Sequence, residues 1–199
     1  MTPLAIDLFC GLGGWTEGLL AEGYQVVGFD NKRHVYGEAR YPAQLVIQDV
    51  VTLHGSQFKA ATLIVASPPC QAYSYRAQPW KRAKALPSPD NTLFEACFRI
   101  QREAIEAAGH HIPLVVENVC GAQKWVGRAR WHAGSMYLWG DVPALMPYGK
   151  YRKQDGDPRW FYGNYEKSAR RFSSRSKERK QWSAEIAKIP FWLSSHIAR

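Results

Sequence analysis

The sequence predicts an α/β fold of the Rossmann-like type: a mostly parallel sheet with helices on both faces, followed by a small basic C-terminal extension. Short apolar runs, of the length of buried strands, alternate with helical or loop segments over the first 140 residues. Residues 4–30 also show the order strand, glycine turn, helix, strand and acid, which opens a nucleotide-binding α/β sheet. With 199 residues, the chain is large enough for one domain with a real core.

The opening unit holds the first candidate binding residues. An apolar strand at residues 4–9 leads into a glycine turn at residues 10–14. A helix at residues 15–22 then ends at Gly23, and a second strand at residues 24–29 ends in Asp30. The G-x-G-G spacing is not the G-x-G-x-x-G of a dinucleotide site, but its glycines let a ligand approach a helix N-terminus. Asp30 lies nineteen residues after Gly11, about where a ribose-binding acid stands. The unit favours an adenosine-type ligand, with a tight turn and an exposed aspartate as the alternative.

The remaining elements follow from apolar periodicity. Residues 92–108 carry apolar side chains at helical spacing, with Asn91 or Thr92 as the N-cap and Gly109 as the stop. Cys97 is then expected in the core. Short apolar runs predict four more strands: residues 45–50, 62–66, 113–116 and 134–140.

A cysteine follows two prolines directly after the strand at residues 62–66. Because Pro68 and Pro69 lack an N–H and have a fixed φ, we expect a stiff loop there, with Cys70 held on it. Ligands gather at the carboxyl ends of strands in open α/β sheets. Cys70 is therefore a candidate nucleophile. Taken alone, Pro-Pro-Cys is more typical of a buried cysteine after a structural turn.

Acidic side chains follow two other predicted strands. Asp49 comes near the end of strand 45–50, and Glu117 follows strand 113–116, so with Cys70 they are expected at the ends of neighbouring strands. A thiolate that adds to C6 of a pyrimidine makes C5 electron-rich enough to attack a methyl sulfonium, and an acid at the ring N3 stabilises the developing charge. A cysteine beside a glutamate, in a sheet with an adenosine-type site, therefore indicates methyl transfer to a pyrimidine C5.

Several motifs, in order, resemble those of the DNA cytosine-5 methyltransferase family. Residues 7–14 (DLFCGLGG) resemble its cofactor loop, and Asp30 and Asp49 lie where the family keeps acids for the ribose hydroxyls and the adenine amine. Pro69-Cys70-Gln71 matches the nucleophile motif. The resemblance also includes Asn91-Thr92-Leu93-Phe94, whose leucine packs on the cofactor, and Glu117-Asn118-Val119, whose glutamate contacts the Watson–Crick edge of the cytosine.

The resemblance implies the S-adenosylmethionine-dependent methyltransferase form of the fold, with S-adenosyl-L-methionine as cofactor and no metal. The activity it implies is methylation of cytosine C5 in DNA, by covalent addition of Cys70 to C6 of a flipped cytosine with Glu117 assisting at N3. Catalytic roles are implied for Cys70, Glu117, Arg128 and Arg130. The implied cofactor-binding residues are Phe9, Gly11, Leu12, Gly13, Gly14, Asp30, Asp49, Val50, Pro69 and Leu93.

The sequence departs from the family pattern in its second half. Arg128-Ala129-Arg130 resembles the Q-x-R-x-R arginines, which hold the cytosine O2 or a flanking phosphate, but the glutamine is missing. Residues 189–198 resemble the last family helix, which completes the cofactor pocket in the larger enzymes. Ile186-Ala187 stands where G-N is usual, so the polar cofactor contact from this helix is left open.

The charge of the chain is concentrated late in the sequence. Residues 150–180 hold eleven Lys and Arg against four acids, which is +7 of the chain's net +9. Basic residues interleaved with aromatics suit phosphate contact and base stacking, so we expect DNA contacts from residues 72–91 and 150–182. The expected organisation is a catalytic and cofactor-binding domain, a reduced basic target-recognition or DNA-contact segment, and a C-terminal helix packing back on the catalytic domain: residues 1–140, 141–185 and 186–199. So short a recognition region predicts short-context or relaxed sequence specificity.

The composition argues against several other classes of protein. The four cysteines are scattered without a C-x-x-C pair, so neither a disulfide framework nor a zinc site is expected. No apolar run reaches the length of a membrane span, and the N-terminus has no basic stretch before an apolar one. We therefore expect a protein of the cytoplasm, in a bacterium or in the host cell of a virus.

Alternatives stay open at this point. Exocyclic amino methyltransferases have Pro-Pro followed by an aromatic residue, whereas here Cys70 follows and Glu117 would have no role. The same fold can methylate cytosine C5 in RNA or act on free nucleotides. A partner that supplies target recognition, half of a split enzyme, or a non-catalytic nucleic-acid-binding protein would also fit the reduced C-terminal region. Restriction-modification, self-protection and regulation are roles that the residues do not distinguish.

Overall fold

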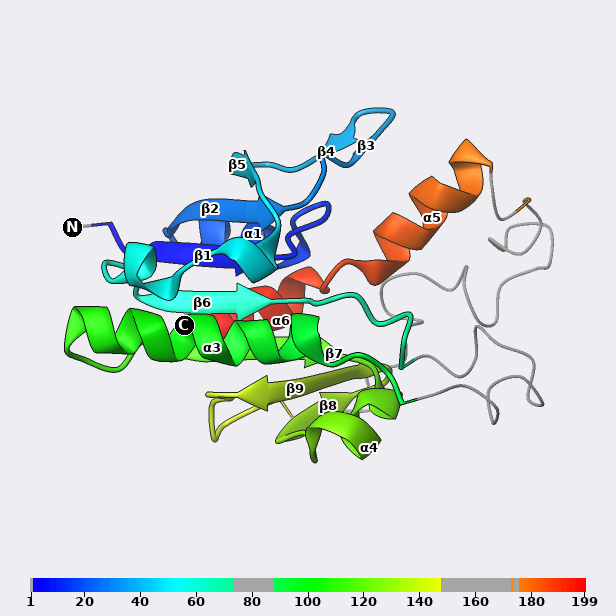
Figure 1. The fold of residues 1–199 in the computed structure, drawn as a ribbon. Helices are drawn as coiled ribbons and strands as arrows, with labels where there is room; N and C mark the ends of the chain where they lie inside the picture. The colour runs from blue at the N-terminus through cyan, green and yellow to red at the C-terminus, as the bar shows by residue number, and fades with distance from the viewer. Residues whose placement is uncertain (1, 74–87, 148–172, 174–175) are drawn as a thin grey trace.

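The computed structural model describes residues 2–73, 88–147, 173 and 176–199 (Figure 1). Its centre is a seven-stranded sheet in the order β5-β2-β1-β6-β7-β9-β8. The five strands from β5 to β7 run parallel, β9 runs antiparallel to β7, and β8 runs antiparallel to β9. The predicted mostly parallel Rossmann-like sheet is confirmed. The strands of this sheet are β1 (Leu4–Leu8), β2 (Gln25–Asp30), β5 (Gln44–Ile47), β6 (Leu63–Ala66), β7 (Leu114–Asn118), β8 (Trp131–Ala133) and β9 (Met136–Gly140).

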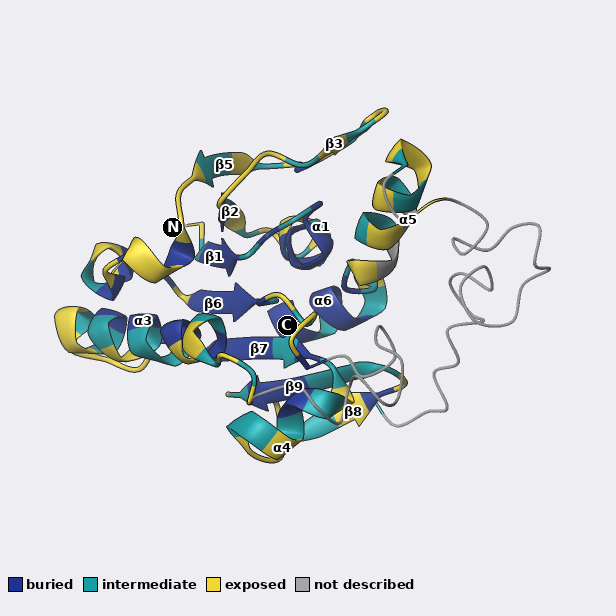
Figure 2. Ribbon diagram, turned by 45° about the vertical axis from the view of Figure 1, so that its right-hand side comes forward, coloured by how far each residue is buried: buried dark blue, intermediate teal, exposed yellow. Residues whose placement is uncertain are grey.

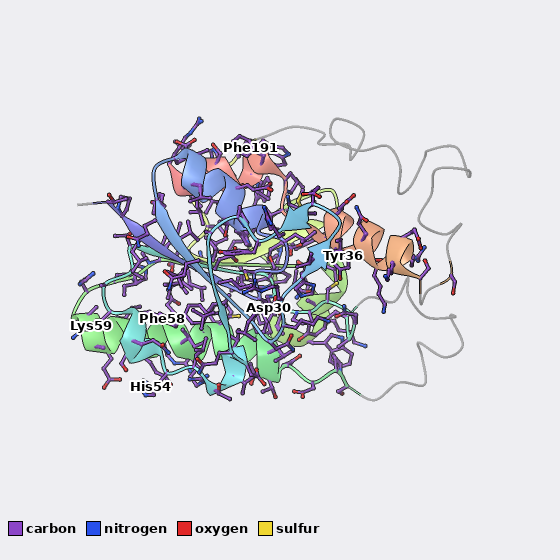
Figure 3. All side chains as sticks on the ribbon, turned by 90° about the horizontal axis from the view of Figure 1, so that it is seen from above. Asp30, Tyr36, His54, Phe58, Lys59 and Phe191 are labelled. Atoms are coloured by element: carbon purple, nitrogen blue, oxygen red, sulfur yellow. The ribbon has the colours of Figure 1, made fainter. Side chains whose placement is uncertain are left out.

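Helices cover both faces of the sheet. Figure 3 shows α1 and α6 on one side of the strands, and α3 with the short 3₁₀ helices near Phe58 on the other. No helix in the described ranges is long and apolar enough to cross a membrane. The helices are α1 (Gly14–Ala21), α3 (Thr92–Ala108), α4 (Gln123–Val126), α5 (Lys177–Ala187) and α6 (Phe191–Ala198), with 3₁₀ helices η1 (Val50–Thr52), η2 (Gly55–Phe58) and η4 (Cys120–Ala122).

The strands form where the sequence has continuous apolar runs, because both faces of a parallel sheet are covered. All four residues of β6 are buried, and Figure 2 shows the central strands as the most buried part of the fold. Alternate strand residues feed two cores. Ile64 and Ala66 pack with α3, whereas Leu63 and Val65 pack with α1 and α6. This double core fixes the sheet and therefore fixes the loops at the strand ends.

Helix α3 has the bounds predicted from its periodicity. Its N-cap is Asn91, one of the two predicted residues, but the Asn91 side chain makes no capping bond; instead, Oδ1 of the preceding Asp90 accepts hydrogen bonds from the Thr92 backbone N–H at 2.8 Å and from the Thr92 hydroxyl. Its end is Gly109, which has a left-handed φ of 72°. Cys97 is fully buried on this helix, as predicted.

Two predictions about the strands need correction. The strand expected over residues 45–50 ends at Ile47, because Asp49 turns the chain and caps η1 through a bond from the Val51 N–H to its Oδ1 (3.1 Å). The strands were also expected to be neighbours, and only two of the three are. Strand β6, which leads to Cys70, is adjacent to β7, which contains Glu117, but β2 and β1 separate β5 and Asp49 from them.

Some elements are present that the sequence did not predict, besides α4 and the 3₁₀ helices. A short hairpin, β3 (Val35–Tyr36) and β4 (Ala39–Arg40), follows β2, and β8 precedes the predicted strand at residues 134–140. Helix α5 occupies residues 177–187, where a basic loop was expected. Its Ser176 N-cap accepts a bond from the Arg179 N–H at 3.1 Å. Most of the two expected DNA-contact segments, residues 74–87, 148–172 and 174–175, lies outside the described residues.

Candidate active site

The candidate residues come from the carboxyl ends of four adjacent parallel strands. The glycine loop, residues 9–14, follows β1, and Asp30 ends β2. Residues 67–73 follow β6, and Glu117 lies near the end of β7. Figure 1 shows these four strands side by side with their arrowheads at the same edge. This is the edge at which open α/β sheets bind ligands.

The glycine loop is a tight turn that leaves open space beside it. Phe9, Gly11 and Gly13 all have left-handed φ angles, 57°, 52° and 81°, and Phe9 is the one non-glycine residue in the described ranges with such a φ. A Cβ added to Gly11 would meet no atom within 4 Å, whereas one added to Gly13 would lie 2.5 Å from Pro42. Gly13 is therefore needed for packing, and Gly11 borders a space that a ligand can enter.

Asp30 is held against this loop. Its side chain is buried, and its Oδ2 accepts a hydrogen bond from the Gly11 backbone N–H at 3.0 Å. Its Oδ1 accepts a longer bond from the Lys32 N–H (3.3 Å) and lies 3.5 Å from Nε2 of His34. The acid predicted for a ribose therefore lies next to the glycine that borders open space. Figure 3 shows Asp30 at the end of the strands that faces the hairpin residue Tyr36.

A buried polar cluster lies beneath the glycine loop, and the sequence analysis missed it. The Thr16 hydroxyl donates to Oδ2 of Asp7 at 2.6 Å and lies 2.6 Å from the Tyr41 hydroxyl. Asp7 is 1% exposed, and its Oδ1 has no hydrogen-bond partner among the described residues. The pKa of Asp7 is raised to about 7, mainly by burial; the Thr16 bond opposes this rise, and the nearby Asp30 charge adds to it. Only the fold joins Asp7 to Tyr41, so the motif alone could not reveal the cluster.

The loop that carries Cys70 is held from two sides. Ser67 Oγ accepts a bond from the Trp15 indole N–H at 3.0 Å, and the Ser67 N–H donates to the Leu8 carbonyl at 3.2 Å. On the other side, the Asn118 amide Nδ2 donates to the Pro68 carbonyl at 2.9 Å. Pro68 and Pro69 have no N–H and donate no backbone hydrogen bond. The side-chain bonds from Trp15 in α1 and Asn118 in β7 therefore hold the loop in place.

After Cys70 the chain turns back toward α3. The Tyr73 N–H donates to the Cys70 carbonyl at 3.0 Å, which closes a turn. The buried Tyr73 side chain donates its hydroxyl to Oδ1 of Asn91 at 2.9 Å, next to the start of α3. The predicted cofactor contact Leu93 lies half-buried in the first turn of that helix.

Cys70 and Glu117 are both half-buried; Cys70 lies in the loop after β6 and Glu117 lies in β7, and these two strands pair at Ala66 and Val116. Two of the other three cysteines have environments unsuited to a nucleophile. Burial raises the pKa of the Cys10 and Cys97 thiols well above their ordinary value. Cys120 is exposed, three residues after Glu117, so an experiment has to distinguish it from Cys70.

The remaining predicted site residues differ in how far their side chains are exposed to a ligand. Asp49 and Pro69 are exposed, whereas Leu12 is 5% and Val50 is 1% exposed, so the side chain of Val50 belongs to the core. A ligand beside Val50 would therefore meet its backbone. Gly14 is in close contact with the C-terminal segment, since a Cβ there would lie 2.3 Å from the Ile189 nitrogen.

Arg128 and Arg130 are exposed on the link between α4 and β8. The link is fixed by its backbone: the Arg130 N–H donates to the Leu138 carbonyl at 2.8 Å, and the Ala129 N–H donates to Oε1 of Gln123 at 3.2 Å. The two side chains thus lie outside the core, while hydrogen bonds hold the backbone around them in place. No group of three metal-ligating side chains occurs within the ranges that the structure describes.

Comparison with known families finds one match to the sequence. A family model for C-5 cytosine-specific DNA methylases matches residues 4–124, roughly three fifths of the chain. The match includes the glycine loop, Asp30, Cys70 and Glu117, and it ends before Arg128. Comparison with curated proteins finds no match.

Several solved structures are similar to the chain over part of their length. One is described as a DNA modification methyltransferase encoded within a prophage of E. coli (22% identity, TM-score 0.41, 63% of this chain and 34% of that chain). Others are the S. pombe Dnmt2 methyltransferase (17%, 0.41, 62% and 36%) and the Entamoeba histolytica methyltransferase EhMeth (14%, 0.40, 62% and 40%). The chain thus spans between 34% and 40% of the length of these three proteins.

Proposed function

The chain belongs to the C-5 cytosine-specific DNA methylase family, as its motifs predict, and from this premise we propose that it transfers a methyl group from S-adenosylmethionine to C5 of cytosine in DNA. One observation carries the proposal. The Cys70 loop and Glu117 come from adjacent strands, joined by the 2.9 Å bond from Asn118 to Pro68, at the edge that also holds the glycine loop and Asp30. The residues that we propose as nucleophile, acid and cofactor contacts therefore lie at the same ends of neighbouring strands.

The residues at this edge fit S-adenosylmethionine. Gly11 borders open space, and the Asp30 carboxylate beside it offers acceptors for ribose hydroxyls. The exposed Asp49 carboxylate and the Val50 backbone would hold the adenine amine, and the remaining contacts come from Phe9, Leu12, Gly13, Gly14, Pro69 and Leu93. Bound there, the cofactor supplies an electrophilic methyl group on a positively charged sulfur.

Cys70 makes C5 of the cytosine nucleophilic. Its thiolate forms a bond to C6, and the electron pair of the C5–C6 double bond becomes available at C5. C5 then bonds to the methyl carbon as the bond from that carbon to the sulfonium sulfur breaks. Loss of the C5 proton to a base restores the double bond and expels the Cys70 thiolate. The stiff Pro68-Pro69 loop suits this role because the sulfur must meet one face of the ring.

Glu117 assists as a general acid. A proton that it donates to the ring N3 neutralises the negative charge that develops when the thiolate adds. Arg128 and Arg130, exposed on a firmly attached link, would hold the cytosine O2 or a flanking phosphate. The cytosine has to leave the duplex stack first, because the C6 face of a stacked base cannot be reached.

Target choice depends on how the protein contacts the DNA around the flipped cytosine. The basic segments at residues 72–91 and 150–182 would contact the DNA backbone, and the reduced region 141–185 favours a short or relaxed recognition sequence. The reduced region is also the reason for a second form of the same proposal, in which a protein partner supplies recognition. A methylation map of treated DNA distinguishes a short context from a long, strictly required sequence.

Methyl transfer by the purified protein tests the activity. With labelled S-adenosylmethionine and duplex DNA, we expect the wild-type protein and Cys120→Ser to transfer label, and Cys70→Ser to lose it while still binding the cofactor. Glu117→Gln should lower the rate by roughly 10²–10⁴-fold, the usual contribution of a general acid. Full activity of Cys70→Ser would contradict thiol addition.

The substrate and the need for a partner are read from the same assay. Duplex DNA, single-stranded DNA and RNA are compared side by side, and the proposal expects the highest rate on DNA. A higher rate on RNA would favour the RNA cytosine-5 alternative. If the wild-type protein transfers nothing but still binds S-adenosylhomocysteine, the partner-dependent or the non-catalytic form is favoured over the active single chain.

A further inference from the structure

The bond between Trp15 and Ser67 joins the cofactor loop directly to the nucleophile loop. We propose that it makes Trp15 and Ser67 positioning residues, which set where the Cys70 sulfur stands relative to the methyl donor. The inference rests on the proposed function and deepens it, because it concerns how two parts of that site are kept in register. The Trp15 indole N–H donates to Ser67 Oγ at 3.0 Å.

At one end of this bond, Trp15 moves with the cofactor loop. It is the second residue of α1 and follows Gly13 and Gly14 directly. Its ring is 2% exposed and packs in the core with Leu19 and Val65. A large, enclosed ring on the first turn of a helix cannot change its position unless the turn before it moves as well.

At the other end, Ser67 moves with the nucleophile. It is the last residue before Pro68 and Pro69, whose rings fix φ, so the four residues from Ser67 to Cys70 have few ways to bend. The Ser67 N–H is fixed to the Leu8 carbonyl at the end of β1, and β1 itself leads into the glycine loop. A shift of Ser67 is therefore passed on to the sulfur.

A purely structural role of the bond makes a different prediction. A buried indole N–H needs an acceptor, and Ser67 Oγ supplies one. If that were the whole role, removing the bond would lower stability and leave the rate of the folded enzyme unchanged. A positioning role lowers the turnover number, since a displacement of about 1 Å at a reacting group can cost on the order of 10²-fold in rate. Binding of the cofactor alone does not involve the sulfur and should be retained.

The test compares four variants with the wild-type protein. Trp15→Phe removes the donor, Ser67→Ala removes the acceptor, the double variant removes both, and Ser67→Thr keeps the hydroxyl. Thr62→Val is the matched control. Thr62 directly precedes β6, whereas Ser67 directly follows it, and the Thr62 hydroxyl donates to the Leu4 carbonyl at 2.9 Å. For each protein we would measure the turnover number for methyl transfer, the KM for DNA, and the Kd of S-adenosylhomocysteine by calorimetry.

The expected result is a turnover number about tenfold lower in Trp15→Phe and in Ser67→Ala, with the Kd of S-adenosylhomocysteine within twofold of wild type. Because both changes remove the same bond, the double variant should lose about tenfold and not a hundredfold. Ser67→Thr and Thr62→Val should keep the wild-type rate. If Trp15→Phe fails to fold, Ser67→Ala and Ser67→Thr still decide the question.

Two results would overturn the inference while leaving the proposed function intact. One is an active wild-type protein whose Ser67→Ala variant turns over within twofold of it. The other is a double variant whose losses multiply. A wild-type protein that binds S-adenosylhomocysteine but transfers no methyl group would instead contradict the active single-chain form of the proposed function, and the positioning role in that form with it.

Discussion

At the scale of single residues, the surroundings of Cys70 distinguish it from the other cysteines as a candidate nucleophile. Cys10 and Cys97 are buried with raised thiol pKa values, whereas Cys70 is half-buried on a loop bonded on both sides. The sequence predicts Cys70 and Glu117 because each stands in a short motif directly after an apolar strand. It does not reveal the bonds of Trp15 and Ser67, because a hydrogen bond between residues 52 positions apart leaves no local pattern.

The buried carboxyl of Asp7 predicts an unusual pH dependence of stability. Its pKa is about 7 in the folded protein and near 3.8 in the unfolded chain, so the folded state holds this proton more tightly. The stabilisation is fully present below about pH 4 and is lost as the pH rises through 7. Between pH 5 and pH 8 the loss from this group should be on the order of 2–3 kcal/mol.

Urea unfolding of the wild-type protein and Asp7→Asn at pH 5, 6, 7 and 8 measures this. The asparagine does not titrate. As the pH rises, we therefore expect the free energy of unfolding of the wild-type protein to fall relative to that of Asp7→Asn. A constant cost of the buried amide in Asp7→Asn does not affect the trend. Two parallel curves from pH 5 to pH 8 would show that Asp7 is ionised in the folded protein throughout.

At the scale of elements, the site depends on how the C-terminal helix packs against the helix that follows the glycine loop. Helices α1 and α6 meet through small residues: a Cβ on Gly18 would lie 2.1 Å from Ser194 Oγ and 2.3 Å from the Ser195 nitrogen. At the edge of the contact, Glu22 accepts bonds from the Ser195 hydroxyl and from Arg199, and Lys188 pairs with Glu17.

This close packing predicts that Gly18→Ala destabilises the protein. Alanine is favoured over glycine in a helix by about 1 kcal/mol, but the added methyl group meets backbone atoms of α6 that cannot move aside. We expect a net loss of roughly 1–3 kcal/mol, the usual cost of overpacking, and a melting temperature lower by several degrees. The control is Leu20→Ala, since Leu20 is 39% exposed on the same helix and should cost less. A Gly18→Ala variant as stable as the wild-type protein would mean that α6 is not docked this closely.

The elements that the sequence predicts are those with a clear period or a long apolar run. The bounds of α3 could be predicted because its capping region and Gly109 flank seventeen residues with helical spacing. The hairpin β3–β4 could not, because strands of two residues have no detectable alternation. Helix α5 is mostly charged or polar, and without an apolar stripe it resembles a basic loop in sequence.

At the scale of the whole molecule, the expected chemistry is confined to one edge of the sheet. The motifs predict which residues follow strands, but the order of the strands is a property of the complete fold. Asp49 shows the difference: it follows a strand as expected, yet β2 and β1 lie between that strand and the one that leads to Cys70. Among the described strands, β5 pairs only with β2, so Asp49 lies on the side of Asp30, away from the Cys70 loop.

This confinement predicts where substitutions affect ligand binding. S-adenosylhomocysteine at about 100 times its Kd should stabilise the folded protein by about 2.7 kcal/mol. We expect Asp30→Asn to reduce the resulting rise in melting temperature. Asp141 lies at the opposite ends of the parallel strands, beside the start of β7. Its Oδ2 accepts bonds there from the Leu114 N–H and from Gln101. Asp141→Asn should lower the melting temperature but keep the full rise on adding the ligand, and an equal reduction in both variants would place the ligand elsewhere.

The central claim is that Cys70 attacks C6 of a cytosine, and a trapping experiment tests it most directly. Duplex DNA in which 5-fluorocytosine replaces cytosine is incubated with the protein and S-adenosylmethionine. Fluorine at C5 cannot leave as the proton does, so the covalent complex should persist in denaturant, and peptide mapping should find the modified nucleotide on Cys70. Cys120→Ser should form the same complex and Cys70→Ser none. An adduct on Cys120, or a complex that forms in Cys70→Ser, would contradict the account.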